Sequence, residues 1–537
     1  MGNEVDHDTL LTMLAEAHAR VDAKIHEHSQ LLKAAAKADW DKPATDRANE
    51  ALNEMLAAHK EFQHLLERAE QQLVAEGYVF PPEPTPVPPQ VDRLWREELE
   101  REKVAVNAYI EDALADGLDF LISRLPQDWW KEQNQRREDF GHEHLRESVV
   151  LFGSVSESHL ASPIHQYAYA LMLARDNLAG RENYDIYSGA FLVPFIAKLC
   201  SLIDPLREAK SGFDKLDELR LAPSGEIPSR LYELIVGGRC VLMGRDVEFL
   251  PADPAEVTPD LRILNLGFPA VVECKMQSRL SAHEKLEFVT MQELFSALAM
   301  GPHRLIGILS IVSTVPLEDV GIKALLEASL KCVGGIDPYQ SIIEAWGTIS
   351  FAPLDPTIEL REPTRIYSPD FLEAVFGWDF ETTDYDGICA LIRNNRSITV
   401  LRAELPFCLR WRSEAEKSLD RKARSLASQL SEAFYQVPVG EAGFVYVAYE
   451  ETHRAAIADC RTQKFLDQIA QWEIRKRGIN PQLVVLNRLF LSASHEGRPN
   501  LVENAIYTTF GRGNSWGEEM PISVFIDPSA KPKDTAD

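Results

Sequence analysis

Residues 81–89 contain six prolines in nine positions, in the order Pro-Pro-Glu-Pro-Thr-Pro-Val-Pro-Pro. Proline fixes φ and has no backbone N–H, so this run can neither continue a helix nor pair inside a sheet. An extended, semi-rigid spacer is the conformation that such a composition favours. The sequence therefore predicts a linker at 81–90, which divides the chain into a short part before it and a long part after it.

The part before the linker has the pattern of amphipathic helices. Between residues 8 and 35 apolar residues recur at three-, four- or seven-residue steps, and the stretch 46–76 repeats the pattern. Lys42-Pro43 lies between them and breaks a helix. We predict a helical hairpin or coiled coil over residues 1–80, whose role would be contact and self-association into a homo-oligomer.

The long part divides further where the hydrophobic pattern of the sequence changes. A helical pattern over 91–225 gives way to short β-branched strands over 226–315, and a further α/β domain is predicted over 316–527. Residues 528–537 are rich in Pro and Lys and predict a disordered tail. The expected fold class is multidomain α/β.

Composition restricts the compartment and the partners. No apolar run approaches eighteen residues, and the N-terminus lacks the basic start and apolar stretch of a secretory signal. The seven cysteines are widely spaced without any C-x-x-C pair, which favours reduced thiols over disulfides or a zinc ribbon. These features predict a cytoplasmic protein without a membrane span.

The net charge of −27 argues against a chain coated for non-specific nucleic-acid binding. Residues 401–480 are an exception, with 13 Lys or Arg against 11 Asp or Glu. Two interpretations stay open for this stretch: solvated helix faces, or a local basic surface for nucleic acid.

The elements expected within 226–315 alternate in a definite order. A helix over 229–236 ends at Gly237-Gly238, three strands and a second helix follow, and an apolar strand closes the segment. The strands are expected at 240–250, 260–266, 269–276 and 304–313, and the second helix at 282–298. The predicted order is α-β-β-β-α-β.

Three polar residues fall at informative places on these strands. Asp260 opens the second strand, directly after Pro259. In the third strand, Glu273 and Lys275 share one face because side chains alternate with period two. A charged pair on an otherwise apolar strand is costly to bury without a function or a partner.

These residue types suit the hydrolysis of a phosphodiester. Two carboxylates on adjacent strands can share a hard cation such as Mg²⁺, which lowers the pKa of a bound water and neutralises developing charge. Lys275 can orient or deprotonate the attacking water. Glu233, on the preceding helix, can hold a second metal ion or a metal-bound water.

At these positions the segment resembles the PD-(D/E)xK nuclease superfamily, whose members have a restriction-endonuclease-like α-β-β-β-α-β core. Pro259-Asp260 and Glu273-Cys274-Lys275 carry the resemblance, which covers 226–315. It implies that Asp260 and Glu273 are metal ligands, that the Cys274 backbone carbonyl also ligates, and that Lys275 is the catalytic lysine. Glu233 matches the carboxylate that many members carry on the first helix.

Two nearby pairs of polar residues fit the superfamily's motif less well. Some members have Gln followed four residues later by Tyr on the second helix, whereas here Ser296 follows Gln292. Gln292 and its neighbour Glu293 remain candidates only. Asp246 and Glu248 form a competing carboxylate pair on the first strand, and we expect that pair to face solvent.

The resemblance implies a metal-dependent endonuclease that uses Mg²⁺ or Mn²⁺, with DNA favoured by the habits of the superfamily. A bacterial restriction or anti-phage defence role is an association of the same kind. No P-loop occurs, so an NTPase or a trigger would be a separate partner. Two alternatives stay open: a catalytically inactive scaffold that acts through its coiled coil, and a hydrolase of a non-nucleic phosphoester.

Overall fold

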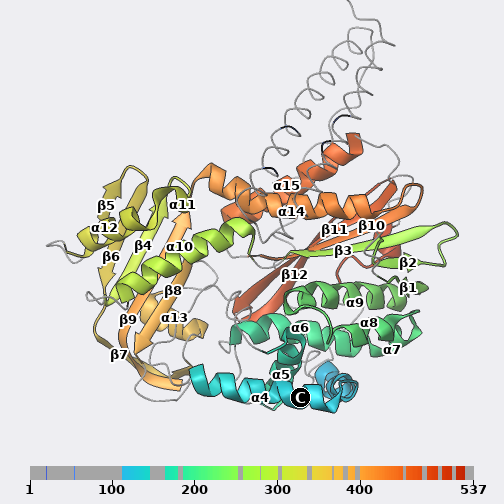
Figure 1. Ribbon diagram of the computed structural model, residues 1–537, viewed down its shortest axis with the longest axis horizontal. Helices are drawn as coiled ribbons and strands as arrows, with labels where there is room; N and C mark the ends of the chain where they lie inside the picture. Colours follow the sequence, from blue (N-terminus) through green and yellow to red (C-terminus); the bar gives the residue numbers. More distant parts are fainter. Residues whose placement is uncertain are drawn as a thin grey trace, which may run out of the picture. The chain divides into compact units, whose positions relative to one another are not determined.

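The computed structural model (Figure 1) describes four residues of the N-terminal part and most of the chain beyond residue 111. The described residues are 20, 24, 47, 54, 112–144, 164–179, 186–251, 258–277, 280–299, 305–334, 341–365, 368–378, 385–392, 399–451, 455–474, 480–493, 499–510 and 516–525. The chain forms two compact units, 1–97 and 98–537.

Little of the first unit is described. Arg20, Lys24, Arg47 and Glu54 are helical, and Lys24 Nζ lies 2.5 Å from Glu54 Oε2. A contact between helical residues on either side of Lys42-Pro43 is one that the predicted hairpin would make. The rest of that prediction, the linker at 81–90 and the tail at 528–537 lie outside the described residues.

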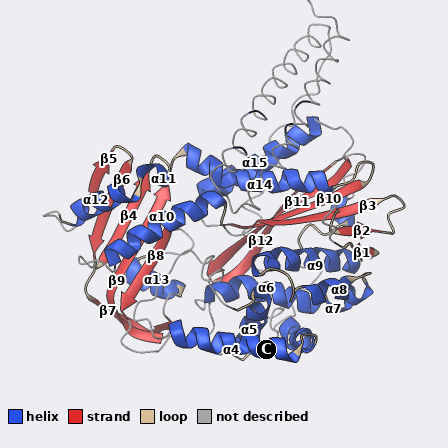
Figure 2. Cartoon of the chain, viewed as in Figure 1, coloured by secondary structure: helices blue, strands red, loops and turns tan. Residues whose placement is uncertain are grey.

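The described residues of the second unit are mixed α/β and form two six-stranded sheets. Figure 2 shows helices packed around both sheets. The first sheet has the order β1-β2-β3-β10-β11-β12. Its strands are β1 (Val247–Phe249), β2 (Leu261–Ile263), β3 (Ala270–Gln277), β10 (Ala442–Glu451), β11 (Asn480–Ala493) and β12 (Pro499–Thr509). β10 runs parallel to both β3 and β11, and the other pairs are antiparallel. The coarse prediction of an α/β fold is confirmed.

Helices cover both faces of the first sheet (Figure 1). One face packs on α5 (Gln166–Leu178), α6 (Ile186–Ser201) and α9 (Ile227–Leu242), and the other on α14 (Glu416–Gln436) and α15 (Ala455–Ile474). Strand β3 shows the expected alternation, because Val272 and Cys274 belong to the first core and Val271 to the second. Burial on both faces explains the near-continuous apolar run of β10.

Around the first core lie α4 (Gln127–His144), α7 (Ile203–Glu208), α8 (Gly212–Glu218), the 3-10 turn η1 (Ser224–Glu226) and α16 (Trp516–Glu519). Described residues of the predicted helical region 91–225, such as Leu114 and Leu171, share this core with strand residues such as Phe444. The described residues of that region, from 112 onward, are therefore part of the same packed body as the sheet.

The second sheet has the order β5-β6-β4-β9-β7, with β8 paired to β9. Its strands are β4 (Gly307–Ser313), β5 (Ser341–Glu344), β6 (Gly347–Pro353), β7 (Thr357–Arg365), β8 (Asp386–Ile392) and β9 (Thr399–Ser413). Helices α10 (Ala282–Ala299) and α12 (Ile322–Val333) share a core with it, α13 (Pro369–Phe376) packs on β7 and β9, and α11 (Leu317–Val320) precedes α12.

The domain boundaries predicted at 226–315 and 316–527 are wrong in one respect. Strand β4 was expected to complete the first sheet, but β10 takes the place beside β3. The reason is packing: Leu309 and Ile311 of β4 bury their side chains with Leu409 and Trp411 of β9. The segment from α10 to β9 is thus an insertion, and the first sheet resumes after α14.

The predicted helix end at Gly237-Gly238 is also wrong, since α9 continues to Leu242 and the first strand begins only at Val247. Both glycines lie where another element approaches closely. A Cβ on Gly237 would lie 2.4 Å from Phe249 Cζ, and one on Gly238 would lie 3.1 Å from Leu202 Cβ. These glycines allow close helix packing instead of ending the helix.

Candidate active site

Asp260 lies where the pairing of β2 with β3 begins. The two strands pair only from Leu261 with Val272 to Ile263 with Ala270, so β3 extends beyond its partner at 273–277. The backbone N–H of Cys274 therefore has no strand partner on that side, and it donates a hydrogen bond to Asp260 Oδ2 at 2.7 Å. The Cys274 carbonyl points to the same side as its N–H, toward Asp260.

Glu273 and Lys275 stand on the face of β3 that α14 covers. Lys275 Nζ lies 2.8 Å from Glu273 Oε1, and the Glu273 side chain is fully buried while that of Lys275 is 23% exposed. The second oxygen of Glu273, Oε2, is buried and accepts no hydrogen bond from any described residue. A buried carboxylate with one open oxygen is suited to take a further positive partner.

Glu233 approaches from α9, on the other face of the sheet. Its Oε1 lies 3.6 Å from the Nζ of Lys215, which α8 carries, and both side chains are about nine-tenths buried. At this distance the two groups form an ion pair, because the separation is too long for a hydrogen bond. Sequence reasoning missed Lys215, because α8 has only seven residues and matches no motif.

The three carboxyl groups are close enough to perturb one another. Burial and the neighbouring Asp260 raise the pKa of Glu233 to about 8. Burial, Asp260 and Glu233 hold the pKa of Glu273 well above its usual value. Burial also raises the pKa of Asp260, although the Cys274 N–H and the nearby lysines act in the opposite direction. The structure therefore places Glu233, Asp260, Glu273 and Lys275 within range of one another's charges.

Lys275 is held in its charged form. Burial favours the neutral amine, but the contact with Glu273 and the charge of Asp260 outweigh it and raise the pKa of Lys275. In this state the ammonium group can orient a water molecule and offset negative charge, and it is a poor base. Of the two roles that the sequence left open for Lys275, the electrostatic one fits the structure.

The other candidate carboxylates lie away from this group. Asp246 is exposed, as expected, but it precedes β1, and Glu248 is only 18% exposed and forms an ion pair with Lys210. Gln292 and Glu293 are exposed residues of α10, which packs on the second sheet.

The basic stretch that begins at Arg402 is largely neutralised within the described residues. Six of its members contact a carboxylate: Arg402 with Glu404, Arg412 with Glu414, Lys417 with Asp319, Arg421 with Glu318, Lys422 with Glu287 and Arg424 with Asp420. Arg410 instead contacts Ser310 Oγ at 2.6 Å and the ring of Tyr385. A second basic group, Arg475, Lys476 and Arg477, lies outside the described residues. Trp411, between Arg410 and Arg412, is buried in the core and is not available to stack on a base. These contacts favour the structural interpretation of the stretch over a free basic surface.

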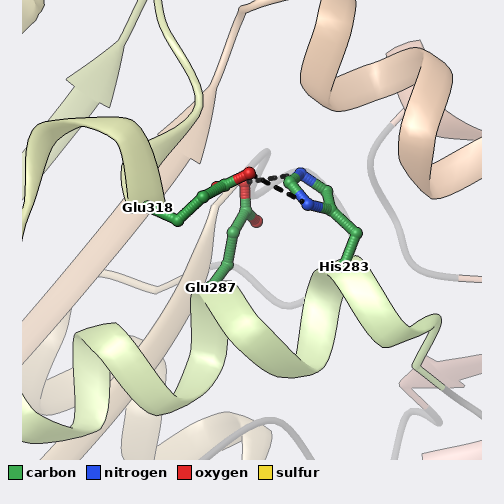
Figure 3. A group of neighbouring side chains, drawn as sticks. All are labelled: His283, Glu287 and Glu318. Carbon is green, nitrogen blue, oxygen red and sulfur yellow. Dashed lines mark ion pairs between the residues drawn. The ribbon is translucent and has the colours of Figure 1, made fainter. Parts of the chain in front are cut away.

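A second polar cluster lies where α10, α11 and α14 meet (Figure 3). His283 Nδ1 lies 3.3 Å from Glu318 Oε1, and His283 Nε2 lies 3.7 Å from Glu287 Oε1. One ligand atom from each of these three residues lies within 4.8 Å of the other two, so the geometry alone can hold a cation. The sequence offered only a partial signal, the His and Glu four positions apart on one helix.

The charges around this second cluster oppose a metal ion. The ammonium of Lys422, which is fully buried, contacts Glu287, and Arg421 donates to Glu318 at 2.6 Å. Each carboxylate thus already has a cation. Ser418 donates to Glu287 at 2.9 Å and lies 3.0 Å from His283 Nε2, but it is fully buried and no substrate can reach its hydroxyl. We interpret the cluster as a buried ion-pair network that joins α10 to α14.

Comparison of the chain with protein-family models, with curated proteins and with solved structures finds no significant match. In the described part of the chain, no helix is both long and apolar enough to cross a bilayer. The geometry of the site is therefore what bears on function.

Proposed function

We propose that the protein is a metal-dependent nuclease whose active site consists of Asp260, Glu273 and Lys275, with Glu233 beside them. The observation that carries the proposal is the convergence of three buried carboxyl groups whose pKa values are all raised. Burial is the largest cause of these shifts, and repulsion from neighbouring carboxylates adds to it at Glu233 and Glu273. A divalent cation bound between the carboxylates would offset both effects.

The donor set fits a hard cation such as Mg²⁺ or Mn²⁺. Asp260 and Glu273 offer carboxylate oxygens, Glu273 Oε2 is free of hydrogen bonds among the described residues, and the Cys274 carbonyl points to the same side. When bound, the metal supplies an activated water and offsets charge on the phosphate. Lys275 then orients the water and stabilises the charge that builds up on the scissile group.

The arrangement of elements supports the same proposal. Helix α9 and strands β1, β2 and β3 precede the insertion, and α14 and β10 follow it, with β10 parallel to β3. This is the α-β-β-β-α-β order expected of a PD-(D/E)xK core, interrupted between its third strand and its second helix. DNA as substrate, a defence role and an NTPase or trigger partner remain expectations from that resemblance, as does self-association through the N-terminal part.

Cleavage of supercoiled plasmid DNA and of single-stranded RNA, with Mg²⁺ or Mn²⁺, tests the proposal. The wild type is expected to nick or cut one of them, and Lys275→Ala and EDTA are expected to abolish the activity. Glu293→Gln, an exposed change on α10, is the matched control and should retain it. No cleavage by the wild type under either metal, or equal cleavage by Lys275→Ala, contradicts the proposal.

The assay also separates the two alternatives. A protein that binds metal but cleaves neither polymer nor a small phosphodiester fits the inactive scaffold. Cleavage of bis(4-nitrophenyl) phosphate together with inactivity on both polymers fits a hydrolase of a non-nucleic phosphoester.

A further inference from the structure

Lys215 is a buried lysine beside a buried carboxylate. It is 8% exposed, and its Nζ lies 3.6 Å from Glu233 Oε1 and 3.8 Å from Glu218 Oε2. Glu218 is half-exposed and solvated, so Glu233 is the partner that offsets the cost of burying the ammonium group.

The backbone around Lys215 holds it in place. The N–H of Lys215 donates to Ser211 O at 3.1 Å, and Lys210 exchanges backbone hydrogen bonds with Val247 and Phe249 of β1. Gly212 permits the tight approach to the preceding helix, because a Cβ there would lie 2.2 Å from Leu206 O. The lysine is thus carried by a segment that is fixed to the same sheet as Asp260 and Glu273.

Two lysines therefore flank the three carboxyl groups, Lys275 at Glu273 and Lys215 at Glu233. With all five groups ionised the cluster carries one net negative charge, and the charges of Arg230 and Glu432, which also act on it, cancel each other. One divalent ion changes this to one positive charge, which suits an anionic phosphodiester. Two divalent ions would leave three positive charges in a buried site, with an ammonium group in direct competition for Glu233.

We propose that the ammonium group of Lys215 takes the place of a second metal ion, so that the site binds one divalent ion, between Asp260 and Glu273. Glu233, already paired with Lys215, contacts that ion through water. This inference rests on the proposed nuclease function and decides between the two roles that the sequence left open for Glu233. Lys215 acts as a positioning residue, because it works through Glu233.

Counting bound Mn²⁺ on the full-length protein tests the inference, by calorimetry and by paramagnetic resonance of free Mn²⁺. The wild type is expected to bind one equivalent. Lys215→Met is expected to bind a second, weaker equivalent at the vacated position, and Lys215→Arg to stay at one. Lys210→Met, an exposed lysine of the same segment, is the matched control and should also bind one.

The two substitutions of Lys215 are also expected to differ in their effect on kcat. Lys215→Met should lower kcat at least about tenfold with little change in KM, as loss of a group that orients a metal-site residue does, and Lys215→Arg should recover part of the loss. Thermal unfolding checks that each variant is folded. If Lys215→Met does not fold, the number of Mn²⁺ equivalents bound by the wild type decides whether the inference holds.

Two equivalents on the wild type, or an unchanged count in folded Lys215→Met, overturn the inference while leaving the nuclease proposal standing if cleavage is observed. Absence of any Mn²⁺ binding overturns both.

Discussion

The carboxylate of Asp260 accepts a hydrogen bond from the backbone N–H of Cys274 at 2.7 Å. Asp260 precedes β2 and Cys274 lies in β3, so this bond fixes one proposed ligand against the strand that carries the other, Glu273. A charge-assisted hydrogen bond to a backbone amide is shorter and stronger than a neutral one. The proposed metal position therefore lies beside β3, at the point where this strand extends past the end of β2.

Asp260→Asn is expected to leave the fold intact and to remove metal binding. The amide oxygen can still accept from the Cys274 N–H, but it has no negative charge to attract a cation. We expect a loss of activity on the order of 100-fold or more, with Mn²⁺ affinity lost in parallel. Asp246→Asn, a change of the same type at an exposed position, is the control. Mn²⁺ titration and circular dichroism measure the outcome, and an Asp260→Asn protein that binds Mn²⁺ like the wild type would count against this site.

The raised carboxyl pKa values predict how the stability of the metal-free protein depends on pH. The pKa of Glu233 rises from 4.5 to about 8 on folding, so between these values the folded state binds more protons than the unfolded state. Stability from this group is fully present below pH 4.5 and is lost as the pH rises through about 8. Asp260 and Glu273 shift in the same direction and add to the trend.

Thermal unfolding in EDTA across this pH range measures the effect. The wild-type melting temperature should fall as pH rises, Glu233→Gln should flatten the slope, and Glu293→Gln should not. Added Mg²⁺ should stabilise the protein increasingly at higher pH, because the metal replaces bound protons. A wild-type melting temperature that rises with pH in EDTA is the result that contradicts this prediction.

Local pattern was enough to predict the strand that carries the site. The alternation along β3 places Glu273 and Lys275 on one face and Val272 and Cys274 on the other, as the structure has them. This works because side-chain direction in a strand is fixed by the backbone alone. The sequence placed the start of the neighbouring strand at Asp260, whereas β2 begins one residue later, at Leu261.

Pairing between distant segments was not predictable in the same way. Strand β10 lies beside β3 although an insertion with its own sheet separates them in sequence. An apolar pattern predicts that β4 is buried, but it does not identify the sheet to which the strand belongs. The same limit explains why Lys215 was missed: its relation to Glu233 exists only after α8 and α9 pack together.

Gly237 offers a test of how α9 is positioned. A Cβ at this position would lie 2.4 Å from Phe249 Cζ, and Phe249 is buried in the core. Gly237→Ala is therefore expected to destabilise the protein by about 1–3 kcal/mol through overpacking, despite the higher helix propensity of Ala. Because Glu233 lies one turn earlier on the same helix, Mn²⁺ affinity should weaken as well.

A second substitution checks the cause. Phe249→Leu makes room for the methyl group, so the double variant should be less destabilised than the sum of the two single variants. Denaturant midpoints measure all four proteins. Additive losses would show that Gly237 is required for another reason, such as its backbone conformation.

The contact between Glu287 and Lys422 joins α10, at the start of the insertion, to α14, where the first sheet resumes. Both side chains are at most 1% exposed, so removing one partner leaves an uncompensated buried charge. Lys422→Met is expected to destabilise the protein by about 3 kcal/mol or more, whereas Lys422→Met with Glu287→Leu should recover much of the loss, since an apolar pair of similar volume has no charge to desolvate. Denaturant midpoints give the comparison, with Lys417→Met, at an exposed ion pair of α14, as the control.

The second cluster, of His283, Glu287 and Glu318, is expected not to bind a metal ion, because two cations already neutralise its carboxylates. Added Zn²⁺ or Mn²⁺ should therefore not raise the denaturant midpoint of an Asp260→Asn protein, in which the first site no longer binds metal. A metal-dependent gain that His283→Ala removes would instead make the second cluster a metal site.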